Sequence, residues 1–140
     1  MTDIQYSYSH AAILVSDIER SARFYERAVG WQHEFSREFD GVLGEANAYG
    51  GPGRIAMGNM GGVHLQLVQM EVPLETKGLQ PHCGIFMCSV MVDDLEPVRE
   101  RLRGADIPIT RELDIGGVRL LVVTDPDGQE LGIMAMRADA

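Results

Sequence analysis

Side chains that can act as acids, bases or metal ligands stand in three strand-like segments of this chain. Histidine and carboxylate groups are the usual general acids and bases, and imidazole, amide and carboxylate groups are also ligands for divalent metal ions. In each segment apolar residues alternate with polar ones, as they do in a strand with one buried face. The residues are His10, His64, Gln66 and Glu130. Whether they can act together depends on the elements that carry them.

The first of these segments runs directly into an amphipathic helix. Residues 10–15 alternate like a strand, and the apolar residues of 18–29 then recur at helical spacing, with charged residues on the other faces. Ser16 and Glu19 predict a capping box at the start of this helix, and Gly30 stands where a left-handed residue would end it. The stretch therefore predicts a strand that is followed at once by a helix.

The same arrangement returns in the second half of the chain. Residues 86–92 alternate, and a helical segment, residues 96–103, follows and is closed by Gly104. Three more strands are expected in each half, at residues 33–37, 54–58 and 63–70 and at residues 110–113, 118–123 and 130–136. Two copies of a β-α-β-β-β unit therefore account for most of the chain.

The predicted fold class is α+β, and 140 residues are enough for one domain. Two tandem modules must then share that domain. Module 1 covers about residues 8–70, a linker about residues 71–83, and module 2 about residues 84–137. A Gly-rich stretch, residues 41–53, lengthens the first module, and we expect it to be a mobile loop.

Composition argues against several kinds of partner. The net charge of −9 disfavours binding to nucleic acid or to an anionic membrane, both of which would repel the chain. No apolar run approaches the length of a membrane span. The two cysteines, Cys83 and Cys88, together with an N-terminus unlike a secretory signal, favour a reduced, cytoplasmic setting. The sequence carries no motif for nucleotide, phosphate or flavin binding.

Two stretches resemble a known family. VSDIERSARFYERAVGW, residues 15–31, and TDPDGQELGI, residues 124–133, are similar to the signature stretches of the vicinal oxygen chelate superfamily. That superfamily includes glyoxalase I, extradiol dioxygenases, methylmalonyl-CoA epimerase, and the bleomycin- and fosfomycin-resistance proteins. The resemblance runs from about Tyr8 to Met136 and implies two βαβββ modules that form a curled, cup-like mixed sheet with helices on the outer face. One scaffold carries many reactions here, so the resemblance specifies the fold rather than the reaction.

The resemblance also implies where metal ligands would stand, namely at cup-facing positions of the first, fourth, fifth and eighth strands. His10 and Gln66 match the family pattern, whereas Met87 stands where a histidine is usual and Gly132 where a glutamate is usual. Two ligands, one of them a neutral amide, would hold a divalent ion weakly. An alternative set, displaced by one pleat, consists of His10, His64, Gln66 and Glu130, and could hold Zn, Ni, Mn or Fe.

The cup-facing positions of the second module are rich in methionine. A flexible, polarisable lining of this kind suits a bulky apolar ligand. We therefore expect a small, largely apolar molecule in the cup and no resident cofactor, with His10 and Glu130 as acid–base groups. The expected ligand-binding residues are His64, Gln66, Met87, Ser89, Met91 and Met134.

Simpler interpretations stand beside these. His64 and Gln66 could be hydrogen-bonded lining residues, Glu130 a solvated charge at the rim, and the methionines core filling. We expect Cys88 to be an inert core thiol and His82 a surface loop residue. The sequence leaves open whether the protein is an enzyme. The alternative function is a metal-dependent lyase, isomerase or dioxygenase with displaced ligands, and a purely structural dimer module is the third hypothesis.

The half-sheets also predict the oligomeric state. Each curled half-sheet leaves open strand edges and has little core of its own. Related proteins resolve this by pairing halves between chains, so we expect a homodimer.

Overall fold

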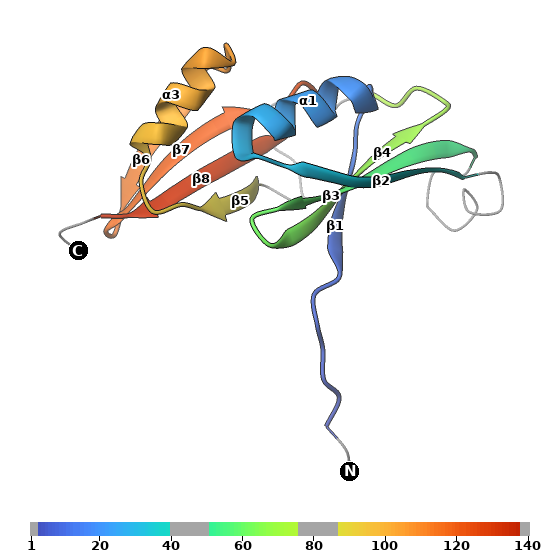
Figure 1. Ribbon diagram of the computed structural model, residues 1–140, viewed down its shortest axis with the longest axis horizontal. Helices are drawn as coiled ribbons and strands as arrows, with labels where there is room; N and C mark the ends of the chain where they lie inside the picture. The colour runs from blue at the N-terminus through green and yellow to red at the C-terminus, as the bar shows by residue number, and fades with distance from the viewer. Residues whose placement is uncertain (1–2, 40–50, 76–86, 138–140) are drawn as a thin grey trace.

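The computed structural model describes residues 3–39, 51–75 and 87–137. They form an α+β structure in which two four-stranded sheets carry one helix each (Figure 1). The first module consists of β1 (His10–Leu14), α1 (Ile18–Val29), β2 (Gln32–Phe39), β3 (Gly53–Met60) and β4 (Val63–Met70). The second consists of β5 (Met87–Met91), α3 (Glu96–Gly104), β6 (Arg111–Ile115), β7 (Val118–Thr124) and β8 (Glu130–Met136).

Both sheets have the same strand order and the same mixture of directions. The orders are β1-β4-β3-β2 and β5-β8-β7-β6, with β1 parallel to β4 and β5 parallel to β8, while the other neighbours are antiparallel. The predicted repeat of two βαβββ modules is therefore confirmed. In the described part of the chain the two sheets are separate, and β1 and β5 are edge strands of their sheets. The predicted loop of residues 41–53 lies almost wholly outside the described residues, and its last residue, Gly53, belongs to β3.

Helix α1 begins one residue later than the capping-box pattern indicates. Its N-cap is Asp17, whose side chain accepts a hydrogen bond from the backbone N–H of Arg20 at 3.1 Å. Ser16 is not the cap, because its hydroxyl instead donates to the carboxylate of Asp127 in the other module. The predicted C-terminus is confirmed, since Gly30 has φ 68° and its N–H bonds back to the Glu26 carbonyl.

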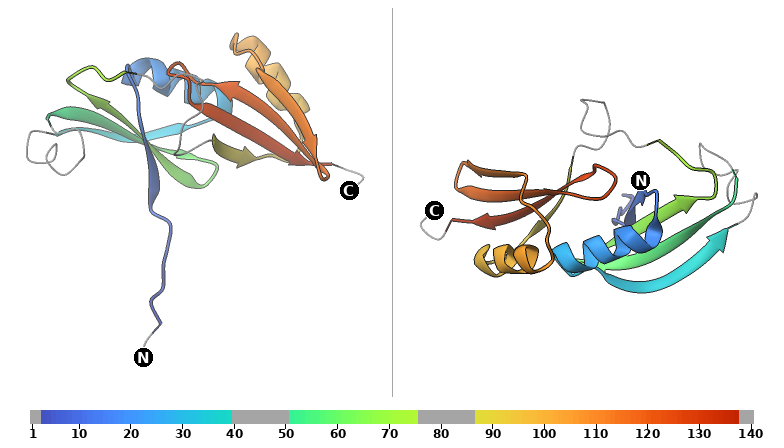
Figure 2. Two further views of the ribbon diagram at one scale, coloured as in Figure 1. Left: turned by 180° about the vertical axis from the view of Figure 1, so that it is seen from behind. Right: turned by 90° about the horizontal axis from the view of Figure 1, so that it is seen from above.

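The helices lie on one side of both sheets, and the sheet faces beneath them form one apolar core (Figures 1 and 2). Leu65 and Leu67 of β4 and Leu131 and Ile133 of β8 are almost completely buried there. Tyr25 of α1 is also fully buried in this core. The core therefore extends across both modules rather than dividing into two.

Polar contacts also tie the modules together at the ends of α1. The Tyr25 hydroxyl donates to the Asp125 carboxylate at 2.8 Å, and the Ser16 N–H donates to Asp127 at 3.0 Å. Arg101 of α3 donates to the backbone carbonyls of Glu26 and Arg27. Burial raises the pKa of both Tyr25 and Asp125 above their usual ranges. We call this group of contacts the inter-module clasp.

Residues 3–9 form an extended N-terminal arm that precedes β1. Every residue of the arm is exposed, and the arm has no regular secondary structure. Figure 1 and the left view of Figure 2 show it projecting away from both sheets. Separately, none of the helices in the described ranges has the length and apolar character needed to cross a bilayer.

Candidate functional site

The sheet faces opposite the helices carry the residues that the sequence places in a cup. In β4, Leu65 and Leu67 are buried against the helices, whereas His64 and Gln66, which alternate with them, remain partly exposed. The same alternation separates Leu131 from Glu130 in β8. We call these outer faces the cup face of each module, and the burial pattern agrees with the side-chain directions expected from the sequence.

In the first module, the side chains of His10, His64 and Glu34 lie together near the start of β1. The parallel register places His10 beside His64, and Ala12 beside Gln66. The Nδ1 atom of His10 lies 2.9 Å from the Ser9 hydroxyl. The Nε2 atom of His64 lies 3.0 Å from a carboxylate oxygen of Glu34, and both side chains are nearly half exposed. This module thus presents an imidazole–carboxylate pair next to a second imidazole.

Glu34 is a site residue that the sequence pattern does not reveal. The register of β2 against β3 shifts between His33 and Phe35, so Glu34 lies at a β-bulge. A bulge inserts one residue and changes the face on which a side chain emerges. That shift accompanies the contact of Glu34 with His64 across the sheet.

In the second module, Glu130 forms an ion pair with Arg111 of β6. The two groups approach to 2.5 Å, and the Glu130 side chain is only 18% exposed. Glu130 stands beside Met87 in the register of β5 and β8. Arg111 therefore holds the Glu130 carboxylate against the cup face. Arg111 is a second site residue that the sequence-based prediction does not include.

The position where the family usually has its last metal ligand is filled by a thioether. A Cβ atom added to Gly132 would lie 2.6 Å from the Met87 sulfur and 3.0 Å from Leu120 Cδ1. Met87 thus occupies the space that a larger residue at position 132 would need. The two departures from the family pattern, Met87 and Gly132, fit each other.

The donor set of one chain does not fit a metal ion. Within residues 3–39, 51–75 and 87–137, no three His, Cys, Asp or Glu side chains lie close enough to hold one. His10 and His64 are neighbours, but Glu130 lies in the other sheet and is held by Arg111. Metal binding by His10, Gln66 and Glu130 stays a prediction, and no chemical step is assigned to a metal here. His82 lies outside the described residues.

The methionines on the second cup face differ in exposure. Met91 is 59% exposed on the edge strand β5, whereas Met87 on the same strand is partly buried, as is Met134 of β8, which stands beside Met91 in the register. Ser89 lies between Met87 and Met91 and is exposed. This face therefore combines an apolar wall with an accessible edge. On the opposite face, burial and the nearby Asp125 raise the pKa of Cys88, which disfavours the reactive thiolate.

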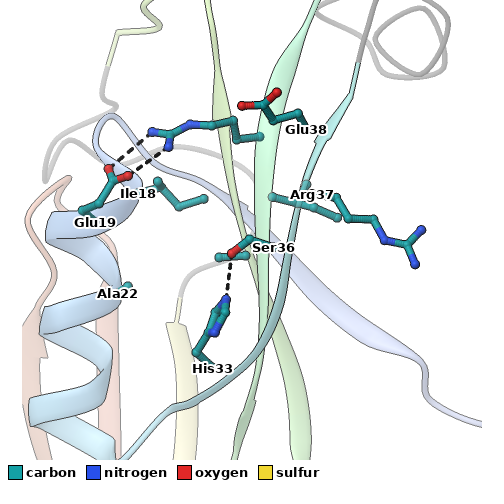
Figure 3. A pocket seen from close by; sticks show the side chains of 10 residues that line it. Ile18, Glu19, Ala22, His33, Ser36, Arg37 and Glu38 are labelled. Carbon is teal, nitrogen blue, oxygen red and sulfur yellow. Dashed lines mark hydrogen bonds and ion pairs between the residues drawn. The ribbon is translucent and has the colours of Figure 1, made fainter.

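A groove of about 290 Å³ lies on the helix side, between α1 and strands β2 and β3. The two oxygens of Glu19 accept bonds from Arg54 at one end, and His33 lies 2.7 Å from the Ser36 hydroxyl at the other (Figure 3). The Arg54 guanidinium holds the pKa of Glu19 below its usual range. Figure 3 also shows the Arg37 side chain pointing away from the groove. The cup face is the stronger candidate site, because it combines its polar pairs with His10, Gln66 and the accessible side chain of Met91.

Comparison with known proteins agrees with this architecture. Residues 7–133 match the Glyoxalase/Bleomycin resistance protein/Dioxygenase superfamily, and the chain belongs to that superfamily. A comparison with curated proteins finds no match.

Solved structures with the same fold are distant in sequence. A glyoxalase family protein from Bacillus cereus is 17% identical, with 99% of each chain covered and a TM-score of 0.81. A domain of the same superfamily from Frankia sp. EAN1pec is 21% identical, with 96% of this chain and 100% of that chain covered and a TM-score of 0.75. A variant of the fosfomycin resistance protein FosX from Listeria monocytogenes, complexed with Mn(II) and 1S,2S-dihydroxypropylphosphonic acid, is 13% identical, with 97% of each chain covered and a TM-score of 0.68.

Proposed function

We propose that this protein binds a small, largely apolar organic molecule against its cup faces. The observation that carries the proposal is the composition of those faces, which combine exposed and half-buried methionines with two polar pairs, His64–Glu34 and Arg111–Glu130. Apolar surface with a few placed polar groups is the usual character of a small-molecule site. Members of this superfamily bind small molecules and commonly form dimers.

The polar groups of the cup could also perform acid–base chemistry without a metal. An imidazole that contacts a carboxylate through one ring nitrogen is held in place by it, and its other nitrogen can accept a proton from a ligand. His64 with Glu34 has this arrangement, and His10 stands beside it. Glu130 suits a different role, because its carboxylate is held in place by Arg111 and can accept hydrogen bonds from the ligand.

A complete cup requires a second chain. Among the described residues, no strand lies beside the outer edge of β1 or of β5, and the two sheets of one chain are separate. We propose a homodimer in which β1 of each chain lies beside β5 of the other. A two-fold axis then gives the outer edges of β1 and β5 in both chains a neighbouring strand. The His10–His64–Glu34 group of one chain and the Glu130 and methionine group of its partner would then line one cup.

Ligand binding tests the proposal. A thermal-shift screen of hydrophobic metabolites should find stabilising molecules, and Met91→Ala should weaken the best of them about tenfold, since removing apolar contact area costs about 0.8 kcal/mol per methyl-sized group. Val72→Ala is the matched control, because Val72 is equally exposed but lies outside the cup. His10→Ala should reduce turnover more than affinity. If Met91→Ala binds as tightly as wild type but melts much earlier, Met91 belongs to the core and the proposal is wrong.

A metal-dependent lyase, isomerase or dioxygenase is the second candidate. The observation in its favour is the Mn(II) complex of the structurally similar FosX protein. Elemental analysis of protein purified without a metal-affinity tag decides the matter. Near-stoichiometric Zn, Ni, Mn or Fe that is lost on His10→Ala would favour this alternative.

A further inference from the structure

The cup face of the first module is arranged in rows that cross its strands. Residues that are opposite one another in the register share one face of the sheet, so each row can be followed from β4 outward. Two of these rows end on β2, and they are Gln66–Met57–Phe35 and Val68–Ile55–Arg37. Ser36, between the two end residues, faces the groove on the helix side (Figure 3). Strand β2 therefore presents Phe35 and Arg37 to the cup.

Arg37 differs from the other arginines in the described strands. Each of the others, Arg54, Arg111 and Arg119, forms an ion pair with a glutamate. Arg37 has no carboxylate partner among the residues that the structure describes. Its guanidinium carbon instead lies 5.2 Å from the centre of the Phe35 ring, which is the distance of a cation–π contact.

This contact leaves the guanidinium available to a ligand. The ring supports the guanidinium through its face, while the N–H groups at its edge match the two oxygens of a carboxylate. The net charge of −9 makes the chain as a whole repel anions, so an anionic ligand needs a local cation of this kind. Phe35 is itself 41% exposed and adds an aromatic surface beside that cation.

We propose that the ligand of the cup is an elongated aromatic carboxylic acid, whose carboxylate binds Arg37 and whose apolar body lies over Phe35 and Met57. This inference rests on the proposed function and adds the class of ligand. The rows of His64 and of Arg37 are four residues apart along β4, which corresponds to roughly 13 Å. An acid held at Arg37 can therefore extend toward the imidazole of His64 while its own charge stays distant from Glu34.

Calorimetric titration with a matched pair of compounds tests this class of ligand. Biphenyl-4-carboxylate carries the charge, and biphenyl-4-carboxamide has a similar shape without it. Wild type should bind the carboxylate about tenfold more tightly, because hydrogen bonds to charged groups are stronger than neutral ones. Arg37→Gln should abolish this preference. The matched control is Arg23→Gln, which removes the same charge from an exposed position of α1 and should retain the preference. Phe35→Ala should weaken binding of both compounds alike.

The other outcomes identify which step is wrong. A preference for the carboxylate that persists in Arg37→Gln would overturn the role of Arg37. Equal binding of the two compounds by wild type would mean that the cup does not recognise an acid group. If neither compound binds but the screen finds neutral apolar ligands, the acid class is wrong and the proposed function stands. If the screen finds no ligand either, the proposed function fails as well. Melting temperatures close to that of wild type should show that the variants are folded, since Phe35 and Arg37 are exposed.

Discussion

At the scale of single residues, each carboxylate of the cup face is held in place by a side chain from another strand. Glu34 contacts His64, and Glu130 contacts Arg111, each across strands that are not adjacent in sequence. The sequence pattern locates His64 and Glu130 on the cup face because alternation along one strand is sufficient for that. It cannot locate Glu34 or Arg111, since their positions depend on a bulge and on the register between strands.

The fit of Met87 to Gly132 leads to a prediction about metal binding. Gly132→Glu alone should destabilise the protein by about 1–3 kcal/mol, because its Cβ would lie 2.6 Å from the Met87 sulfur. Adding Met87→His removes that crowding and restores, with His10 and Gln66, the ligand types usual in the family. Titration with Zn²⁺ or Ni²⁺ should therefore show tighter binding by the double variant than by wild type. A folded double variant without added affinity would mean that these four positions do not converge.

The buried carboxyl of the inter-module clasp predicts a pH dependence of stability. Burial raises the pKa of Asp125, so the folded chain holds this proton more readily than the unfolded chain does. The contribution of Asp125 to the free energy of unfolding is therefore greatest in acid and falls as the pH rises through its folded pKa. Asp125→Asn removes this dependence while its amide oxygen can still accept from the N–H groups of Asp127 and Gln129.

Urea unfolding of both proteins across the acidic range measures this effect. The stability of wild type relative to Asp125→Asn should decline with rising pH. Tyr25→Phe serves as a control, because the Tyr25 hydroxyl donates to Asp125 and favours its ionised form. In that variant the decline should move to higher pH. A constant difference between wild type and Asp125→Asn would contradict the prediction.

At the scale of elements, the strands and helices follow closely from local pattern. The predicted strands at residues 63–70 and 130–136 have the observed bounds of β4 and β8. The strand expected at 33–37 is longer, Gln32–Phe39, because its ends are fixed by pairing with β3 rather than by its own composition. The N-cap is Asp17 rather than the predicted Ser16 for a similar reason, because Ser16 donates hydrogen bonds to Asp127, which is distant in sequence. What sequence does not show in each case is a partner far away along the chain.

Of the described glycines, Gly58 of β3 has the least room for a side chain, because Trp31 packs against it. A Cβ atom added to Gly58 would lie 2.1 Å from the indole Cε2 of Trp31, which is buried and donates its N–H to the Leu65 carbonyl at 3.1 Å. Gly58→Ala should therefore displace the ring and lower the free energy of unfolding by about 3 kcal/mol. Gly104→Ala is the control, because nothing lies near its Cβ position, and it should change stability by less than about 1 kcal/mol. Denaturant unfolding followed by Trp31 fluorescence compares the two, and equal stability would contradict the packing described.

At the scale of the whole molecule, the proposed dimer rests on one shared core and two separate sheets. The helices bury a common core across both modules, yet no other described element covers the cup faces or the outer edges of β1 and β5. The sequence repeat predicts the two modules, but it does not show whether a cup forms within a chain or between chains. That choice depends on the inter-module clasp, whose contacts join residues about one hundred positions apart.

The assembly leads to a simple prediction about mass. Light scattering should show a dimer at micromolar concentration, because the paired edges and apolar faces would bury surface that is exposed in one chain. A monomer over a wide concentration range would count against the dimer.

The inter-module clasp has a consequence for dividing the chain. Tyr25–Asp125, Ser16–Asp127 and the Arg101 contacts all join the first module to the second, and they act together with a shared apolar core. Two polypeptides ending after residue 75 and starting before residue 87 would each expose half of that core and leave Asp125 without its tyrosine. Co-expressed, the two fragments should recombine into the native arrangement. The protein could thus be developed into a split reporter, in which two fragments that are inactive alone regain the native fold when their fusion partners bind each other.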